Sequence, residues 1–406
     1  MTQILDSRYS WTRLAISLGI ATVGNVGMWS IIALLPALQA DFGGGRGAAS
    51  MPYTLTMLGF ALGNLVLGRA VDRFGVSVAL AGASVLSAIG FVGAALAPSL
   101  WALSGAQFLI GLGTAAFFGP LLADVSLWFR RRRGIAVAIA ASGNYLAGAI
   151  WPLALSGVLA DQGWRGVCWL LAVLVPVMVI PTAQLLRRRV PAESMTAAAQ
   201  ATSLSPRRVP FSPRALTWML GLAGIGCCVA MSMPQVHLVA FCVDLGYGPA
   251  VGAEMLSVML LGGVASRLVS GFVTDKLGGI PTLLIGSVGQ MIGLILYLPF
   301  DGLASLYVVS LIFGLSQGGI VPAYAIIVRE TMPAREAGAR VGFVIMATIV
   351  GMALGGWMSG WIYDVTGSYQ MAFVNGIAWN LMNITVILVI LLRSRTGGAS
   401  GRLATA

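Results

Sequence analysis

Long apolar stretches separated by short polar segments run along the whole chain. Twelve stretches hold about 20 mostly apolar residues or more, which is the length that an α-helix needs to cross roughly 30 Å of hydrocarbon. The pattern does not fit the roughly ten-residue alternation of a membrane β-barrel. We therefore expect twelve membrane-spanning helices. They cover residues 13–38, 50–69, 76–97, 101–127, 134–158, 165–186, 215–241, 249–272, 281–299, 304–328, 339–361 and 369–392.

One polar stretch, residues 187–214, is longer than the others. It is basic, rich in Ala, Ser and Pro, and lacks a periodic apolar face, which is typical of a linker. We predict an N-terminal six-helix bundle (1–186), this cytoplasmic linker (187–214), and a C-terminal six-helix bundle (215–406). A role of the linker in phosphoregulation or lipid binding is the alternative to a plain solvated connection.

The two halves share motifs at a constant offset. The G-x-x-x-D-R-F-G sequence at 68–75 matches G-x-x-x-D-K-L-G at 271–278, 203 residues later. The G-x-x-x-D sequences at 157–161 and 360–364 have the same offset. Two matches at one offset indicate an internal duplication, which is typical of transporters built from pseudo-symmetric halves.

The longer motif has a physical interpretation. Its first glycine allows two helices to approach closely, its acid can accept hydrogen bonds from a neighbouring helix end, and its base holds the turn at the headgroups. We expect this contact to lock one conformational state; a static topogenic turn is the alternative. The residues concerned are Gly68, Asp72, Arg73, Gly75, Gly271, Asp275, Lys276 and Gly278.

With its repeat, this motif closely resembles the conserved loop of the major facilitator superfamily, and the resemblance covers essentially the whole chain. It implies an all-α membrane protein with twelve transmembrane helices in two pseudo-symmetric six-helix bundles (the major facilitator fold). It also implies transport by alternating access, usually by a monomer. The sequence has no nucleotide-binding loop, no metal-ligand spacing and one histidine, so we expect no enzyme activity, cofactor or metal.

Composition and charge agree with a membrane protein. The chain is 58% hydrophobic and 9% charged, whereas soluble domains are about 25% charged. The net charge of +11 lies in short loops without interleaved aromatic residues, so we expect no nucleic-acid partner. With both termini inside, 21 of the 24 Lys and Arg residues lie on the cytoplasmic side, Arg46 and Arg165 in outer loops, and Arg267 within a helix. The positive-inside rule thus predicts cytoplasmic termini in the cytoplasmic (inner) membrane.

Arg267 lies inside the apolar run of the eighth span, roughly 12 Å before the turn at 275–278 if each residue rises 1.5 Å. An arginine at that depth costs about 2.5–3.5 kcal/mol on insertion scales, and such charges usually face an internal pathway. Guanidinium binds carboxylate bidentately and stays charged. We interpret Arg267 as the anchor of an anionic substrate. A structural arginine paired with carbonyls or an acid is the alternative.

Three segments strengthen that interpretation. Residues 128–152, WFRRRRGIAVAIAASGNYLAGAIWP, resemble the fifth-helix signature of monocarboxylate transporters. The R-x-x-x-G-x-x-x-D sequence at 267–275 is similar to the substrate-arginine helix of that family and of the oxalate:formate antiporters, and residues 234–248 resemble their seventh helix. The resemblance implies that Arg267 binds a small carboxylate.

The chain also departs from these families. The oxalate exchangers carry a second basic residue in the eleventh helix, where this chain has Thr348; one cation suits a substrate with one carboxylate. Proton-coupled animal carriers have an aspartate one turn before the arginine, where this chain has Gly263, and their first-helix lysine has no counterpart. His237 is the replacement candidate for carrying a proton. A hydrogen-bonded structural histidine is the alternative.

Polar and aromatic residues at comparable depth complete the predicted site. For any single aromatic residue, packing between helices or a place in an interfacial belt is an equal alternative. These polar and aromatic residues are Asn25, Trp29, Phe117, Phe118, Asn144, Tyr145, Gln235, His237, Gln317 and Tyr324. Asp124, near the inner end of the fourth span, is expected to pair with the basic cluster at 130–133.

We therefore expect a secondary transporter in the lipid bilayer that takes up a small organic monocarboxylate, coupled to protons. The alternative is a proton-driven exporter or exchanger of other organic anions or amphipathic compounds. Antiporters of the superfamily carry a Gly-Pro motif in the fifth helix; here Pro152 follows Trp151, which weakens that alternative.

Overall fold

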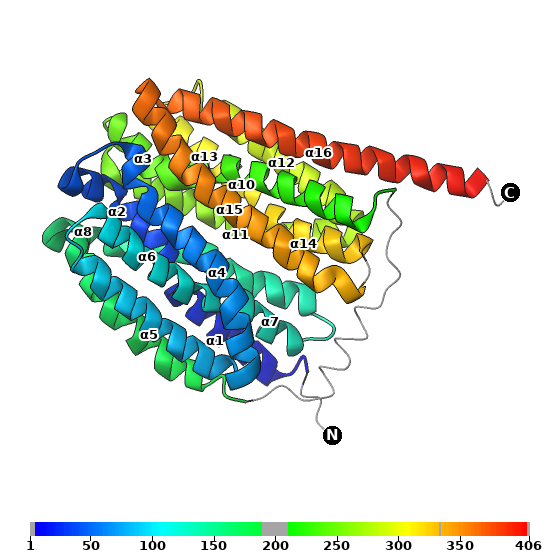
Figure 1. Cartoon of the computed structure of the whole chain (residues 1–406), viewed down its shortest axis with the longest axis horizontal. Helices are drawn as coiled ribbons and strands as arrows, with labels where there is room; N and C mark the ends of the chain where they lie inside the picture. The colour runs from blue at the N-terminus through cyan, green and yellow to red at the C-terminus, as the bar shows by residue number, and fades with distance from the viewer. Residues whose placement is uncertain (1–4, 189–209, 333, 404–406) are drawn as a thin grey trace.

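The computed structural model describes residues 5–188, 210–332 and 334–403, and all regular elements in this part of the chain are helices (Figure 1). Most of the predicted linker lies outside the described residues. The helices are α1 (Arg8–Gly24), α2 (Val26–Phe42), α3 (Arg46–Ala49), α4 (Met51–Phe74), α5 (Val76–Ala95), α6 (Leu100–Thr114), η1 (Ala115–Phe117), α7 (Gly119–Leu127), α8 (Arg133–Gln184), α10 (Pro213–Asp244), α11 (Gly248–Leu277), α12 (Gly279–Leu296), α13 (Leu303–Gln317), α14 (Ile320–Thr331), α15 (Ala334–Thr366) and α16 (Tyr369–Leu403).

Within the described residues, 11 helical segments are long and apolar enough to cross a membrane. The longest, α8, has 52 residues and bends at Gly163, where φ is 68° and ψ is −176°. The bend separates the predicted spans 134–158 and 165–186, so α8 crosses twice. The predicted all-helical architecture is therefore confirmed.

Three predicted spans are interrupted in the middle. The first is split into α1 and α2 at Asn25, the fourth into α6, η1 and α7, and the tenth into α13 and α14 around Gly318. The side-chain amide of Asn25 donates to the Ala21 carbonyl at 2.7 Å, and such local bonds compete with the helical pattern. In the tenth span, Pro322 has no N–H group, so the Gly318 carbonyl lacks its usual helical donor.

The duplication extends to these interruptions. Residues 115–117 form the 3₁₀ turn η1, and the tenth-span break begins at residue 318, again 203 positions later than residue 115. Gly75 and Gly278, which end α4 and α11, have φ angles of 87° and 86°. Such angles favour glycine because it lacks a Cβ atom. The equivalent turns thus have the same backbone shape.

The start of α1 and the end of α16 lie toward one end of the bundle, which we call the terminal end; α3 lies toward the other, which we call the Arg46 end (Figure 1). The two halves meet where α8 packs against α11, α15 against α3 and α4, and α10 against α2. The buried arginine of the eighth span lies in this interface and contacts α8.

At the terminal end, the N-terminal half is tied together by a buried ion pair. The Arg13 guanidinium donates two hydrogen bonds to Asp124, both at 2.9 Å, and a third to the Leu186 carbonyl at 3.1 Å. Asp124 therefore pairs with Arg13 rather than with the expected cluster at 130–133. The backbone N–H groups of residues 130–132 instead donate to Asp6.

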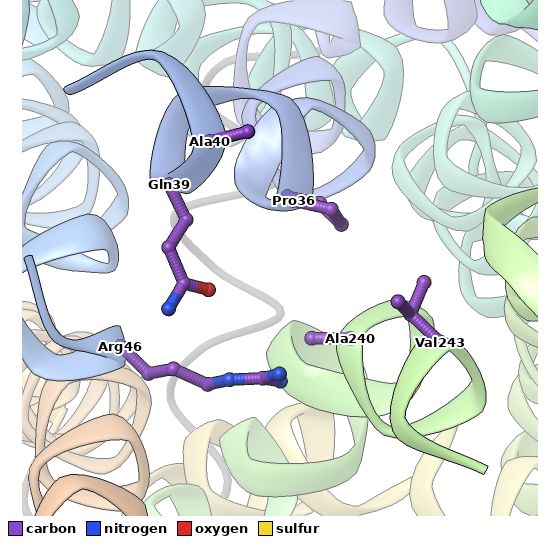
Figure 2. A pocket seen from close by; sticks show the side chains of 6 residues that line it. All are labelled: Pro36, Gln39, Ala40, Arg46, Ala240 and Val243. Carbon is purple, nitrogen blue, oxygen red and sulfur yellow. The ribbon is translucent and has the colours of Figure 1, made fainter. Parts of the chain in front are cut away.

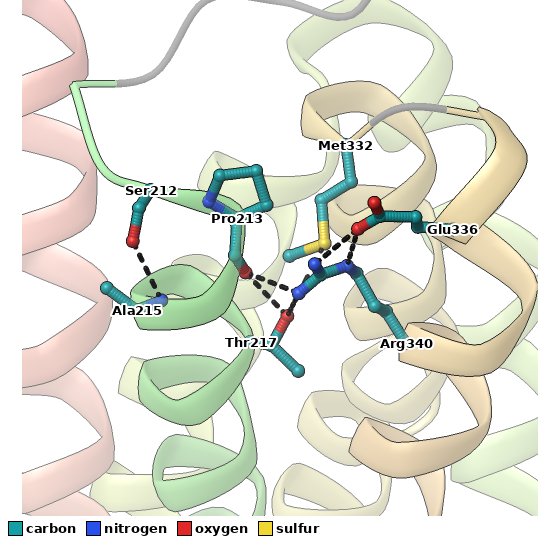
Figure 3. A network of polar contacts seen from close by, with 7 residues as sticks. All are labelled: Ser212, Pro213, Ala215, Thr217, Met332, Glu336 and Arg340. Carbon is teal, nitrogen blue, oxygen red and sulfur yellow. Dashed lines mark hydrogen bonds and ion pairs between the residues drawn. The ribbon is translucent and has the colours of Figure 1, made fainter.

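The C-terminal half has its own polar network at the same end (Figure 3). Arg340 of α15 donates to the Pro213 carbonyl at 2.8 Å and to the Thr217 hydroxyl at 2.7 Å, and it pairs with Glu336. These contacts join the first turns of α10 to α15. The networks described at the terminal end therefore hold each half together without joining the halves.

Candidate functional site

Arg267 is buried where α11, α8 and the break in the tenth span meet, with 7% of its surface exposed. Its Nε donates to the Gly318 carbonyl at 3.2 Å, and its Nη1 donates to the Ala141 carbonyl of α8 at 2.6 Å. The Gly318 carbonyl is free for this bond because Pro322 supplies no N–H group. Ala141 belongs to the N-terminal half, so the guanidinium bridges the two halves.

No acidic side chain in the described part of the chain forms an ion pair with Arg267. The guanidinium instead lies over the Tyr145 ring, 4.2 Å from its centroid. A cation is attracted to the face of an aromatic ring, but this interaction leaves its charge in place. The site therefore holds one positive charge, with carbonyl dipoles and a ring as neighbours.

Two glutamines lie beside this arginine. Gln317 ends α13, immediately before Gly318, and its Oε1 accepts a hydrogen bond from Gln235 of α10 at 2.7 Å. Both are buried, and Gln317 Nε2 and Gln235 Oε1 lack a hydrogen-bond partner. Gly263 lies between the Tyr145 ring and Gln317. A Cβ atom added at Gly263 would lie 3.0 Å from the ring and 3.6 Å from Gln317 Nε2. An unpaired buried amide donor thus lies near the Tyr145 ring, on the residue that precedes the Gly318 carbonyl bound by Arg267.

A second group of predicted residues joins the N-terminal half. Trp29 donates its indole N–H to Asn144 Oδ1 at 3.2 Å, and Asn144 donates to Asn25 Oδ1 at 3.2 Å. Asn25 in turn donates to the Phe117 carbonyl at 3.3 Å, across the breaks in the first and fourth spans. Because Asn144 precedes Tyr145 in α8, this network positions the helix turn that carries the ring over Arg267.

Three predicted residues lie apart from these groups. Tyr324 donates its hydroxyl to Asn383 of α16 at 2.8 Å, within a buried network of the C-terminal half. Phe118 is partly buried and packs near Phe60, with ring centroids 6.1 Å apart. His237 bonds to Tyr369 and to the Gly356 carbonyl, at 3.0 and 2.7 Å. Among described residues, His237 shares no hydrogen-bond partner with Arg267.

His237 belongs to a cluster at the Arg46 end that the sequence did not single out as functional. Arg46 pairs with Asp244 of α10 and donates to the Tyr369 hydroxyl at 2.7 Å. The backbone N–H groups of Arg46 and Gly47 donate to the Asp364 carboxylate at 2.6 and 2.8 Å. We call Arg46, Asp244, Asp364 and Tyr369 the Arg46 latch. The repeated G-x-x-x-D motif, which ends at Asp364, was the signal that could have revealed it.

The longer repeated motif makes little contact in this conformation. A Cβ atom at Gly68 or Gly271 would meet nothing within 4 Å. Asp275 and Lys276 are exposed, and Arg73 lies near the Phe74 ring; the Asp72 side chain lies outside the described residues. The close helix contact expected at both glycines is therefore absent here.

The family model described as Major Facilitator Superfamily matches residues 17–313 and 243–404. This chain belongs to the major facilitator superfamily. It is therefore a membrane transporter and not an enzyme. In the described residues, no group of three or more His, Cys, Asp or Glu side chains is arranged to hold a metal ion.

Individual members of the superfamily are similar to this transporter over most of their length. Monocarboxylate transporter 13 of Bos taurus is 30% identical over 324 residues, which cover 78% of this chain and 74% of that protein. Agnestins efflux protein AgnL12 of Paecilomyces divaricatus is 23% identical over 335 residues, covering 82% and 75%. The crystal structure of a bacterial homologue of the human lysosomal transporter Spinster, inward-facing and occupied, aligns with a TM-score of 0.65 at 14% identity and covers 98% of both chains.

Proposed function

We propose that this transporter carries a small organic monocarboxylate, which binds to Arg267 at the middle of the interface between the two halves. The observation that carries the proposal is a buried guanidinium that has no acidic partner among the described residues. Burying an unpaired charge is costly, and a bound carboxylate removes that cost by forming a charge-assisted pair. The name of the Bos taurus relative supports the same substrate class.

The neighbouring residues suit a carboxylate as well. Arg267 Nη1 now donates to the Ala141 carbonyl, and a substrate oxygen would take over this donor. Gln317 Nε2, which has no partner, would donate to the second oxygen. Tyr145 and Trp29 would then contact the organic part of the substrate. Thr348 in the eleventh span supplies no second cation, which favours one carboxylate over two.

We propose that the Arg46 end faces the outside and that both termini are cytoplasmic, in the inner membrane, because this orientation follows the positive-inside rule. Between described residues, the hydrogen bonds that join the halves lie at Arg267 or nearer to the Arg46 end. With the proposed orientation, this distribution corresponds to a state closed on the outside. Alternating access by a monomer then requires these contacts to break while the terminal end closes.

We propose uptake together with a proton, with His237 as the titrating group, although it contacts the Arg46 latch and not Arg267. The second candidate is a proton-driven exporter or exchanger of other organic anions or amphipathic compounds. It is favoured by the printed name of the efflux protein of Paecilomyces divaricatus. Uptake into liposomes with an inward proton gradient, compared with an outward one, distinguishes the two directions.

The test of the substrate is thermal stabilisation of the purified protein by a panel of mono- and dicarboxylates at two pH values. We expect monocarboxylates to raise the melting temperature of the native protein and to leave Arg267→Gln unchanged. The variant itself should fold, because the substitution removes a buried charge rather than a packed apolar group. Uptake by Arg267→Gln at the native rate would refute the proposed anchor.

A further inference from the structure

A chain of hydrogen bonds runs from the Arg46 latch through His237 to the Gly356 carbonyl, and chemistry fixes its direction. Arg46 can only donate, so the Tyr369 oxygen accepts from Nη1 at 2.7 Å. The Gly356 carbonyl can only accept, so the proton of neutral His237 is on Nε2, 2.7 Å away. His237 Nδ1 therefore accepts the Tyr369 O–H at 3.0 Å. The closed latch therefore requires a neutral His237 in the tautomer that is protonated at Nε2.

A proton added to His237 breaks this order. Nδ1 would become a donor, so the Tyr369 O–H would lose its acceptor and have to turn away, and the Tyr369 oxygen would face two cationic donors, His237 and Arg46. The added charge would also lie close to Arg46, because one hydroxyl separates the two groups. His237 is 2% exposed, so water does not screen the repulsion well.

The titratable groups around His237 come from α3, α4, α10, α15 and α16. Arg46 of α3 and Asp364 of α15 act on it electrostatically. Asp244 of its own helix, α10, is paired with Arg46. The remaining titratable neighbours are the phenols of Tyr369 in α16, Tyr363 in α15, which lies against the Arg46 guanidinium, and Tyr53 in α4, which packs at Gly356. Asp244 is paired with the Arg46 side chain, and Asp364 accepts from the backbone N–H groups of Arg46 and Gly47. Neither carboxylate is therefore left to pair with a protonated His237.

We propose that His237 is the proton sensor of the Arg46 latch: the latch is closed while His237 is neutral, and protonation of His237 opens the Arg46 end. A small cavity of about 230 Å³ next to the latch, lined by Arg46 and Gln39 from one half and Ala240 from the other (Figure 2), gives the arginine space to move when it is released. The gate would then open toward the acidic side, which is the order of steps that proton-coupled uptake requires. The role in uptake rests on the proposed function, whereas the latch itself does not.

The experiment measures opening directly and needs no substrate. Spin labels are attached to cysteines introduced at Pro98 and Asp301, which are exposed and occupy equivalent loops of the two halves at the Arg46 end. The four native cysteines are buried, and protein without introduced cysteines gives the background. The distance distribution between the labels is recorded by pulsed electron paramagnetic resonance from about pH 8 to about pH 5.5, the range in which histidine titrates.

We expect the population with the longer distance to grow several-fold on acidification in the native background, and to stay constant in His237→Gln, which does not titrate. Tyr369→Phe, which removes the hydroxyl between His237 and Arg46, should show a larger open population that depends little on pH. Unchanged pH dependence in His237→Gln would overturn the proposal, as would a constant distribution in the native background. Because no substrate is present, failure here leaves the carboxylate assignment intact, and failure of carboxylate binding leaves the latch intact.

Discussion

Gly360 of α15 allows the two halves to touch at the Arg46 end, and substituting it should open that end. A Cβ atom at Gly360 would lie 2.6 Å from the Arg46 carbonyl oxygen, 2.7 Å from its carbonyl carbon and 2.8 Å from the Gly47 nitrogen. All three are backbone atoms of the other half, so no side chain can turn away. Overpacking of this kind costs about 1–3 kcal/mol, and only the closed state bears the cost. Gly360→Ala should therefore shift the equilibrium about 5- to 150-fold toward the open state.

The assay is the rate at which a membrane-impermeant maleimide labels a cysteine introduced at Ala240, which lines the cavity beside Arg46 and is 7% exposed. The matched control is Gly157→Ala at the equivalent position of the N-terminal half, where a Cβ would meet nothing within 4 Å. We expect faster labelling with Gly360→Ala and an unchanged rate with Gly157→Ala. Equal labelling rates in the two variants would refute the role of this contact in closing the Arg46 end.

Three other substitutions separate binding from stability. Tyr145→Leu removes the ring over Arg267 and should weaken carboxylate binding by about 3- to 30-fold, measured by calorimetry, because a desolvated cation–π contact is worth about 0.5–2 kcal/mol; unchanged affinity would argue against the ring's role. Tyr324→Phe leaves Asn383 without a donor and should destabilise the fold by about 1–3 kcal/mol while binding persists; a loss of affinity at native stability would instead place Tyr324 in the site. Asp124→Asn breaks the buried pair with Arg13 and should cost about 3–5 kcal/mol, seen as a lower melting temperature; an unchanged melting temperature would contradict the burial argument.

The sequence predicts the spans well because hydropathy over about 20 residues is a local property. It does not reveal the interruptions at Asn25 and around Gly318, since these residues sit in runs that remain apolar on both sides. A side chain that competes for a backbone carbonyl, and a proline that removes one N–H group, alter the helix without altering its hydropathy. The interruption at Gly318 matters most, because it exposes the carbonyl that Arg267 binds.

In the candidate site too, some features follow from the local sequence and others depend on tertiary partners. Burial of Arg267 follows from its place in an apolar run, and the structure brings Tyr145 and Gln317 beside it. The destinations of Tyr324 and His237 depend on partners in α16, which no local pattern specifies. The Arg46 latch joins residues 318 positions apart in the chain. Asp364 is visible in the sequence as the end of a repeated motif. Its partner Arg46 is identified only by the packing of the two halves.

If Arg267 anchors the substrate, its positive charge selects a carboxylate. The most direct measurement is calorimetric binding of one small monocarboxylate and of its uncharged amide, which has nearly the same shape, to the purified native protein. We predict saturable binding of the carboxylate and at least a hundredfold weaker binding of the amide, since losing one partner of a buried charge pair costs about 3–5 kcal/mol. Equal affinity for the two compounds would contradict this prediction.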